Sequence, residues 1–233
     1  MKRKILIISI ILCALLIIGV LEYKGIIWHN DLFSMHYEVK GLDVSHHQGT
    51  IDWEIVQKEN EFQFVFMKAT EGHDFIDHQF QTNWKEARKN GMLTGAYHFF
   101  SMRSSGKKQA ENFIQTVPKE PDSLPPVIDL EIHLNHDKED VRRQLKEMAT
   151  EMEKHYGKKP ILYVTYDTYH TYVEGFFKDY DLWIRDVVKF PTLGDRPWIF
   201  WQYSNRGRVD GIDTYVDINV FHGDLEQFNK SFR

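Results

Sequence analysis

The hydrophobic positions of this chain follow two different patterns, which meet near residue 22. Residues 5–21 form one uninterrupted apolar run, preceded by Lys2, Arg3 and Lys4. Beyond it, short apolar segments alternate with amphipathic segments in which apolar residues recur every three or four positions. The first pattern is typical of a segment directed to a membrane, and the second of a folded domain in which strands and helices alternate.

Eight apolar segments of the second region predict strands, at residues 41–47, 62–70, 93–100, 125–132, 160–166, 181–187, 198–204 and 216–221. Amphipathic segments predict helices at residues 51–60, 78–91, 106–117 and 137–157. Alternation of strand and helix predicts a parallel sheet, and eight strands predict a barrel. Because the last strands follow one another without long helices, we expect an irregular TIM-like (β/α) barrel of the α/β class, with reduced helices toward the C-terminus.

The apolar run has the minimum length of a membrane-spanning helix, and the basic residues before it predict a cytoplasmic N-terminus with the rest exported. No small-x-small cleavage site follows, which favours an uncleaved signal anchor over a cleaved signal peptide. We therefore expect an anchor or signal peptide at residues 1–27, a stalk at 28–37 and one catalytic domain at 38–233. The domain is predicted to lie outside the cytoplasm, anchored to the membrane, or secreted if the segment is cleaved.

Composition restricts the function of the exported domain. Hydrophobic residues make up 42% and aromatic residues 14% of the chain, which is typical of a globular protein. The single cysteine, Cys13, lies in the apolar run, so the exported part has no internal disulfide and no CxxC site. Three of the 29 basic residues precede the run, which leaves 26 against 34 acidic residues and a net charge of −8 beyond it. This charge argues against a nucleic-acid partner, and we expect a monomer.

The segment PPVIDLEI, at residues 125–132, places two acids in a predicted buried strand. Alternate residues of a strand share a face, so Asp129 and Glu131 are expected to point together into the barrel, with Cα atoms about 6.5–7 Å apart. Two carboxyl groups in a poorly solvated pocket do not ionise equally easily, so one is expected to stay protonated near neutral pH. A proton donor beside a carboxylate is what a glycosidase requires. A structural salt bridge or a pair of helix-capping acids is the alternative.

Other predicted strands carry further candidates. Asp43 lies in the first strand and Asp217 in the last, and acids from three strands that converge at the C-terminal end of a barrel indicate an active site. Aromatic rings that could stack on sugar rings occur on four strands, although each could instead belong to the core. The candidates for substrate binding are Tyr97, Tyr163, Trp183, Trp201, Tyr203 and Gln202, the last as a hydrogen-bond partner of an acetamido group.

Metal and cofactor chemistry lack support in the sequence. His46 and His47 are adjacent on a predicted strand and should point in opposite directions, and neither HExxH nor a Cys/His cluster occurs. The sequence also has no GxSxG, P-loop or GxGxxG motif. We therefore expect neither a metal nor a cofactor.

Six segments together resemble the family 25 glycoside hydrolases, the lysozymes of the cellosyl and bacteriophage endolysin type. They are GLDVSHHQGTIDW, FVFMKATEGHDFID, GAYHFF, PPVIDLEI, WQYSNRGRVDGI and VDINVF, and they span essentially the whole chain beyond the apolar run in the family's order. The resemblance implies an irregular (β/α) barrel that cleaves the β-1,4 bond between N-acetylmuramic acid and N-acetylglucosamine in the glycan strands of peptidoglycan.

The resemblance also implies roles for individual residues. Glu131 would be the general acid, and Asp129 would orient the substrate's 2-acetamido group as it attacks the anomeric carbon, with net retention. Asp43 and Asp217 match the family's additional active-site carboxylates. The chain departs from the family's usual residues at Glu61 and at Arg185, and the position of Arg185 at a strand end bears on specificity.

Two alternatives to a muramidase remain. One is another glycan hydrolase, chitinase-like or a glucosaminidase, although the chitinase pattern DxxDxDxE does not match the residues before Asp129. The other is a non-catalytic wall-binding module, which would not require four converging acids. Because no repeat-type wall-binding segment follows the barrel, we expect the anchor to supply localisation. Local wall remodelling, for example during assembly of a secretion or conjugation apparatus, is a hypothesis that this expectation suggests.

Overall fold

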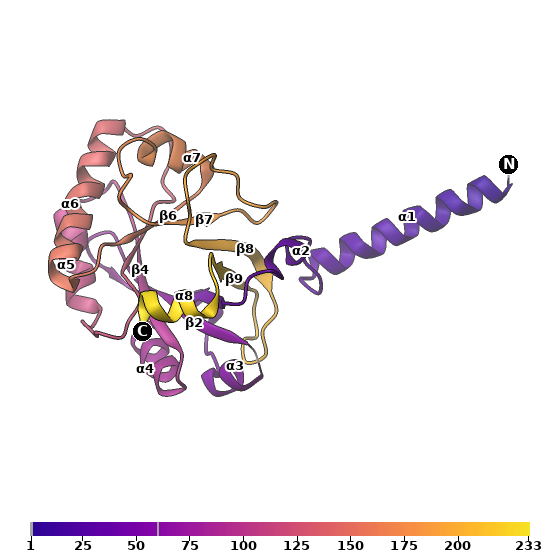
Figure 1. Cartoon of the computed structure of the whole chain (residues 1–233), viewed down its shortest axis with the longest axis horizontal. Helices are drawn as coiled ribbons and strands as arrows, with labels where there is room; N and C mark the ends of the chain where they lie inside the picture. The colour runs from indigo at the N-terminus through magenta and orange to yellow at the C-terminus, as the bar shows by residue number, and fades with distance from the viewer. Residues whose placement is uncertain (1, 60) are drawn as a thin grey trace.

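The computed structural model describes residues 2–59 and 61–233 and shows a barrel from which one long helix projects (Figure 1). Met1 of the predicted N-terminal segment and Asn60 of the first predicted helix lie outside the described residues. The strands are β1 (Lys40–Val44), β2 (Phe62–Glu71), β3 (Phe75–Ile76), β4 (Leu93–Phe99), β5 (Val127–Asp129), β6 (Ile161–Val164), β7 (Leu182–Arg185), β8 (Phe200–Gly207) and β9 (Val216–Phe221). The helices are α1 (Lys2–Tyr23), α2 (Asp31–Ser34), α3 (Trp53–Glu59), α4 (Phe80–Lys89), α5 (Gly106–Thr116), α6 (Lys138–Tyr156), α7 (Tyr166–Thr168) and α8 (Leu225–Phe232).

The sheet closes on itself. Its strand order is β1-β9-β8-β7-β6-β5-β4-β2-β3, and a further parallel pairing of β1 with β2 completes the circle, leaving β3 as a short addition to β2. Within the closed circle, neighbouring strands are parallel except at β9, which runs antiparallel to both β8 and β1, and the added strand β3 runs antiparallel to β2. Residues 186–199 and 208–215, which join the last strands, form no helix. The predicted irregular barrel, with helices reduced toward the C-terminus, is therefore confirmed.

Alternation along the strands separates two apolar layers. Interior side chains, among them Phe64, Phe66 and Phe200, fill the barrel, and a larger layer packs between the strands and the surrounding helices. Helix α8 covers one end of the barrel, where the buried ring of Phe228 lies 5.6 Å from that of Phe64 and 5.3 Å from that of Phe221. The opposite end of the barrel, at the C-terminal residues of the parallel strands, is not covered by α8.

Local signals fix the longest outer helix. Asp137 accepts a hydrogen bond from the backbone N–H of Asp140 at the start of α6, and Gly157 ends the helix in the left-handed conformation. The buried face of α6 packs on the barrel, and α5 lies beside it (Figure 1). The helix boundaries therefore agree closely with the prediction of residues 137–157.

Two predicted strands end three residues earlier than expected, β1 and β5. Strand β1 stops at Val44, because the side chain of Ser45 accepts a hydrogen bond from the N–H of His47 and begins a single 3-10 turn at His46–Gln48. The rings of His46 and His47 are 4.1 Å apart, so the expectation that they point in opposite directions is wrong. Strand β5 covers only Val127–Asp129, and Glu131 follows the strand instead of lying in it.

The N-terminal region has two parts. Helix α1 is 22 residues long, is apolar enough to cross a membrane and has no buried residue (Figure 1). Residues 28–37, expected as a stalk, lie against the barrel. There the indole N–H of Trp28 donates to the carbonyl of Tyr203 at 2.7 Å, and buried Asn30 donates to the carbonyls of Asp186 and Tyr203.

Candidate active site

A pocket of about 180 Å³ opens at the C-terminal end of the parallel strands. The four acids predicted from the sequence all line it. The other lining residues are Ser45, His47, Lys68, Tyr97, Phe99, Val127, Tyr163 and Trp183. The parallel strands β1, β2, β4, β5, β6 and β7 thus each contribute to one site at their C-terminal ends, and antiparallel β9 contributes Asp217 from its N-terminal end.

Asp43 and Asp217 face each other across paired strands β1 and β9. Burial raises the pKa of the Asp43 carboxyl well above its ordinary value, and the neighbouring Asp217 raises it further. Burial also raises the pKa of Asp217, to about 6. A hydrogen bond joins the two groups, which favours a protonated Asp43 donating to an ionised Asp217.

Amide side chains hold this pair in place. The amide of Asn219 donates to Oδ2 of Asp43 at 2.8 Å and accepts from the indole N–H of Trp183 at 2.8 Å. The hydroxyl of Tyr163 donates to the carbonyl oxygen of Gln202, whose amide also bonds to Asp217. The pocket floor is therefore a continuous hydrogen-bond network that fixes both rings and both carboxyl groups.

Asp129 and Glu131 have different surroundings. Asp129 is 7% exposed, and its Oδ1 has no hydrogen-bond partner within the described part of the chain. Burial raises the pKa of Asp129 well above its ordinary value, and the charge of Glu131 adds to this effect. The Glu131 side chain is 35% exposed at the rim, with Oε1 at 3.8 Å from Nε of Arg185. Burial raises the pKa of Glu131, and Arg185 opposes the rise.

Lys68 and Arg185 bring positive charge to the acids. Lys68 is buried, pairs with Glu71 at 2.7 Å, lies 4.9 Å from the ring centre of Phe99 and lowers the pKa of Asp129 against the effect of burial. Lys68, Phe99, Ser45 and His47 also line the pocket and were not among the residues predicted for the site. Alternation along β2 was a usable signal, because it places Lys68 on the interior face with Phe64 and Phe66.

Only some of the predicted aromatic residues reach the pocket. Tyr97, Tyr163 and Trp183 line it, and the ring centres of the last two are 4.9 Å apart. Gln202 lies beneath them through its bond to Tyr163. Trp201 and Tyr203 do not reach the pocket, because alternation along β8 places them in the outer layer, where Trp201 donates to the carbonyl of Asp186 at 2.8 Å. The structure therefore removes these two from the predicted substrate-binding set.

A second group of side chains has donors at a spacing suited to a metal. The ligand atoms of His46, Asp77 and His78 lie within 4.8 Å of one another. Hydrogen bonds already engage Asp77, whose Oδ2 accepts from the N–H and Nδ1 of His46 at 2.9 and 2.7 Å and whose Oδ1 accepts from the N–H of Gln79. Asp77 therefore fixes the turn that carries His47 to the pocket.

The arrangement suits acid-assisted cleavage of a sugar bond. Glu131 combines a raised pKa with access to solvent, so it can hold a proton and deliver it to a leaving oxygen. Behind it, buried Asp129 and half-buried Asp43 and Asp217 can stabilise positive charge that develops on a sugar ring. A wider hollow of about 750 Å³ near Trp84 and Arg233 has no such convergence, since its Asp122 is paired with Arg88 at 2.8 Å.

Comparison with known proteins agrees with this geometry. The model of the family "Glycosyl hydrolases family 25" matches residues 42–212. Lysozyme M1 of Streptomyces globisporus is 32% identical over 201 residues, covering 79% of this chain and 68% of the relative. A family 25 glycosyl hydrolase from Bacillus anthracis is 46% identical with a TM-score of 0.81, covering 85% of this chain and 95% of that one. A lysozyme from Streptomyces coelicolor is 30% identical with a TM-score of 0.74, covering 81% and 94%. The chain therefore belongs to glycosyl hydrolase family 25, and it is a glycosidase of the lysozyme, or muramidase, class.

Proposed function

We propose that this enzyme cleaves the β-1,4 bond between N-acetylmuramic acid and N-acetylglucosamine in peptidoglycan strands, with Glu131 as the general acid. Several observations support this role. Glu131 stands at the rim, where a leaving sugar can depart, and the pKa of its carboxyl is raised by burial. Its contact with Arg185, at 3.8 Å, is longer than a hydrogen bond, so Glu131 stays free to donate its proton to the glycosidic oxygen.

The observation that carries the mechanism is the unpartnered Oδ1 of Asp129. A buried carboxylate oxygen without a donor is costly, and a ligand that supplies an N–H removes that cost. The 2-acetamido group of an amino sugar has such an N–H. With Asp129 accepting it, the acetamido oxygen attacks the anomeric carbon while the bond to the leaving oxygen breaks and Glu131 transfers its proton there.

The second step restores the enzyme. The oxazolinium-like intermediate is opened by water at the anomeric carbon, and Glu131, now ionised, takes the proton of that water. Two displacements at one carbon give net retention. Tyr97, Tyr163 and Trp183 form the aromatic wall for the sugar ring, and the Asp43–Asp217 pair lies below it as a source of negative charge.

The test is digestion of purified peptidoglycan by the full chain in detergent, followed by borohydride reduction and mass spectrometry of the fragments. We expect fragments that end in reduced muramic acid, near-complete loss of activity in Glu131→Gln, and normal activity in the exposed control Glu174→Gln. Fragments that end in reduced glucosamine would identify a glucosaminidase instead. A well-folded wild type that binds peptidoglycan without releasing fragments would favour a wall-binding module.

We also propose that α1 is an uncleaved anchor and that the barrel works on the outer side of the membrane. Arg206 and Arg208, near the end of β8, donate to the carbonyls of Tyr23 and Lys24 at 2.8 and 2.6 Å, so the folded domain uses the C-terminal end of α1 as part of its own structure. Intact mass of the membrane-extracted protein should include α1; a mass that lacks it would show cleavage. This tethering suggests that the enzyme opens the wall locally, for example during assembly of a secretion or conjugation apparatus. A cell that carries Glu131→Gln should then fail to assemble that apparatus.

A further inference from the structure

Helix α1 is joined to the barrel without a flexible link. It ends in a Schellman turn, in which the N–H of Ile26 bonds to the carbonyl of Leu21 and the N–H of Gly25 to that of Glu22. Gly25 has φ of 62°, and a Cβ there would lie 2.1 Å from the carbonyl oxygen of Arg206, so the turn fits closely against β8. Trp28 then anchors the following residues to the barrel.

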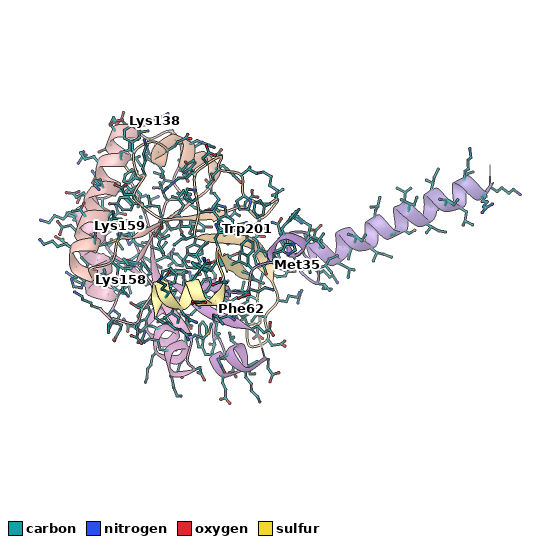
Figure 2. The ribbon with its side chains drawn as sticks, viewed as in Figure 1. Met35, Phe62, Lys138, Lys158, Lys159 and Trp201 are labelled. Carbon is teal, nitrogen blue, oxygen red and sulfur yellow. The ribbon has the colours of Figure 1, made fainter. Side chains whose placement is uncertain are left out.

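An exposed apolar surface lies next to this join. It consists of Ile27, Leu32, Phe33, Met35, Val188 and Phe190, and we refer to it as the anchor-side surface. The exposed fractions of Leu32, Met35 and Val188 are 70%, 66% and 71%. The two segments that form it are in contact, since the ring centres of Phe33 and Phe190 are 6.3 Å apart. Figure 2 shows Met35 on the side of the barrel from which α1 departs.

The charges near the join differ from those of the whole domain. Lys24, Arg206 and Arg208 lie at the end of α1, and Lys189 lies between Val188 and Phe190 of the anchor-side surface. The acids Glu22, Asp31 and Asp186 also lie here, with Glu22 paired with His29 and Asp186 with Lys189. The domain beyond the apolar run has 26 basic and 34 acidic residues, whereas the four basic residues at the join slightly outnumber the three acids beside them. Apolar side chains with basic residues among them are the composition of surfaces that lie in the headgroup region of an anionic bilayer.

The pocket lies close to the join. Tyr215 packs against the Gly25 turn, and the acid Asp217 follows it by two residues along β9, about 7 Å at the usual strand rise. The orientation of the barrel at the membrane therefore also sets the direction in which its pocket faces.

We propose that the anchor-side surface rests on the outer leaflet of the membrane, so that the barrel sits on the bilayer in one orientation. This inference rests on the proposed anchoring by α1, because α1 brings the bilayer to this surface. The molecule that covers this surface is lipid. The apolar run ends at Leu21, Ile27 follows the turn at the end of α1, and Leu32 lies in α2, so these side chains are close to the end of the membrane-spanning segment. Exposed large apolar side chains in this position are buried at the boundary between headgroups and acyl chains.

The experiment measures contact with lipid at single cysteines. The full chain with Cys13→Ser receives a fluorophore at Val188→Cys, Met35→Cys or Phe176→Cys and is reconstituted into phosphatidylglycerol–phosphatidylethanolamine vesicles with or without brominated acyl chains. Phe176 is the matched control, since it is 60% exposed and packs on Arg142 of α6, at the side of the barrel away from α1 (Figure 1). The wild-type chain labelled at Cys13 reports insertion of α1 itself.

We expect brominated lipid to remove about half or more of the fluorescence at positions 188 and 35 and little of it at position 176, because an interfacial surface lies about 5–10 Å into the headgroup boundary. Quenching at Cys13 without quenching at positions 188 and 35 would overturn the proposal and leave the anchoring intact. An unquenched Cys13 would refute the anchoring and the proposal together. Equal quenching at all three barrel positions would show a barrel without a fixed orientation, which also overturns it.

Discussion

Replacing Asp217 by asparagine should stabilise the folded protein above about pH 6. Burial raises the pKa of Asp217 from the ordinary 3.8 to about 6, so the folded state resists ionisation of this group. The sign follows from proton linkage: below pH 3.8 both states are protonated, and as the pH rises to about 6 the unfolded state loses its proton first. Stability is therefore lost across this interval, and the ionised group costs the folded state stability above it.

The difference of roughly two pKa units corresponds to about 3 kcal/mol at 1.36 kcal/mol per unit. Asparagine removes this cost, and its side-chain oxygen can still accept the hydrogen bond of protonated Asp43. We expect a gain of about 1–3 kcal/mol at pH 7.5, and about a third of that at pH 4.5, because pH 4.5 lies only about a third of the way from the pKa of the unfolded state to that of the folded state. For a domain of this size the gain at pH 7.5 equals a rise in melting temperature of roughly 2–12 °C.

Near-ultraviolet circular dichroism of the full chain in detergent, heated at both pH values, measures the effect. Asp213→Asn is the matched control, because Asp213 is an exposed acid four residues away and should change the melting temperature little at either pH. A melting temperature of Asp217→Asn below that of wild type at pH 7.5, or an equal gain at both pH values, would refute the reasoning.

Substitutions at two further positions test other parts of the structure. Arg185→Ala removes a positive charge 3.8 Å from Oε1 of Glu131, so the pKa of Glu131 should rise and the alkaline limb of the pH–activity profile should move to higher pH. Arg185→Lys should retain most of the wild-type profile. An alkaline limb that does not move in Arg185→Ala would show that Arg185 does not act on the general acid. Phe228→Ala removes the contact between α8 and the barrel interior and should lower the free energy of unfolding, measured by urea titration, by about 3–5 kcal/mol. Activity at low temperature should stay near wild type, because α8 closes the barrel end opposite to the pocket. A loss below about 1 kcal/mol would mean that α8 contributes little to closing the barrel.

The sequence predicted the barrel well because strand and helix patterns were long and regularly separated. It did not predict α8, although Asp224 and Gln227 form a capping box and Phe228 and Phe232 lie one turn apart. Eight residues give little periodicity, and their stability comes from packing on Phe64, which lies 164 positions earlier. Contacts this distant are not visible in a local pattern.

All four acids selected from the sequence line one pocket, whereas only some of the selected aromatic residues do. Asp129 could be predicted because burying a carboxyl group in an apolar strand is energetically costly, which indicates a functional role. Trp201 could not be assigned to a face in the same way, because both faces of a barrel strand are apolar, and only the pairing of Gln202 with Tyr163 fixes which residues of β8 point inward. The rim contact between Arg185 and Glu131 joins two strand ends, so it depends on the closure of the barrel.

The close join between α1 and the barrel also determines how such an enzyme would search for its substrate. A flexible ten-residue linker would have a root-mean-square end-to-end distance of roughly 17 Å and would let the domain rotate freely. The contacts of Gly25 with Arg206 and of Trp28 with Tyr203 remove that freedom. With α1 inserted, the barrel would therefore diffuse only in the plane of the membrane, with its pocket at a constant distance from the bilayer. Glycan strands would then be cleaved only where they pass within a barrel's diameter of the bilayer, and the spacing between wall and membrane would itself control the rate.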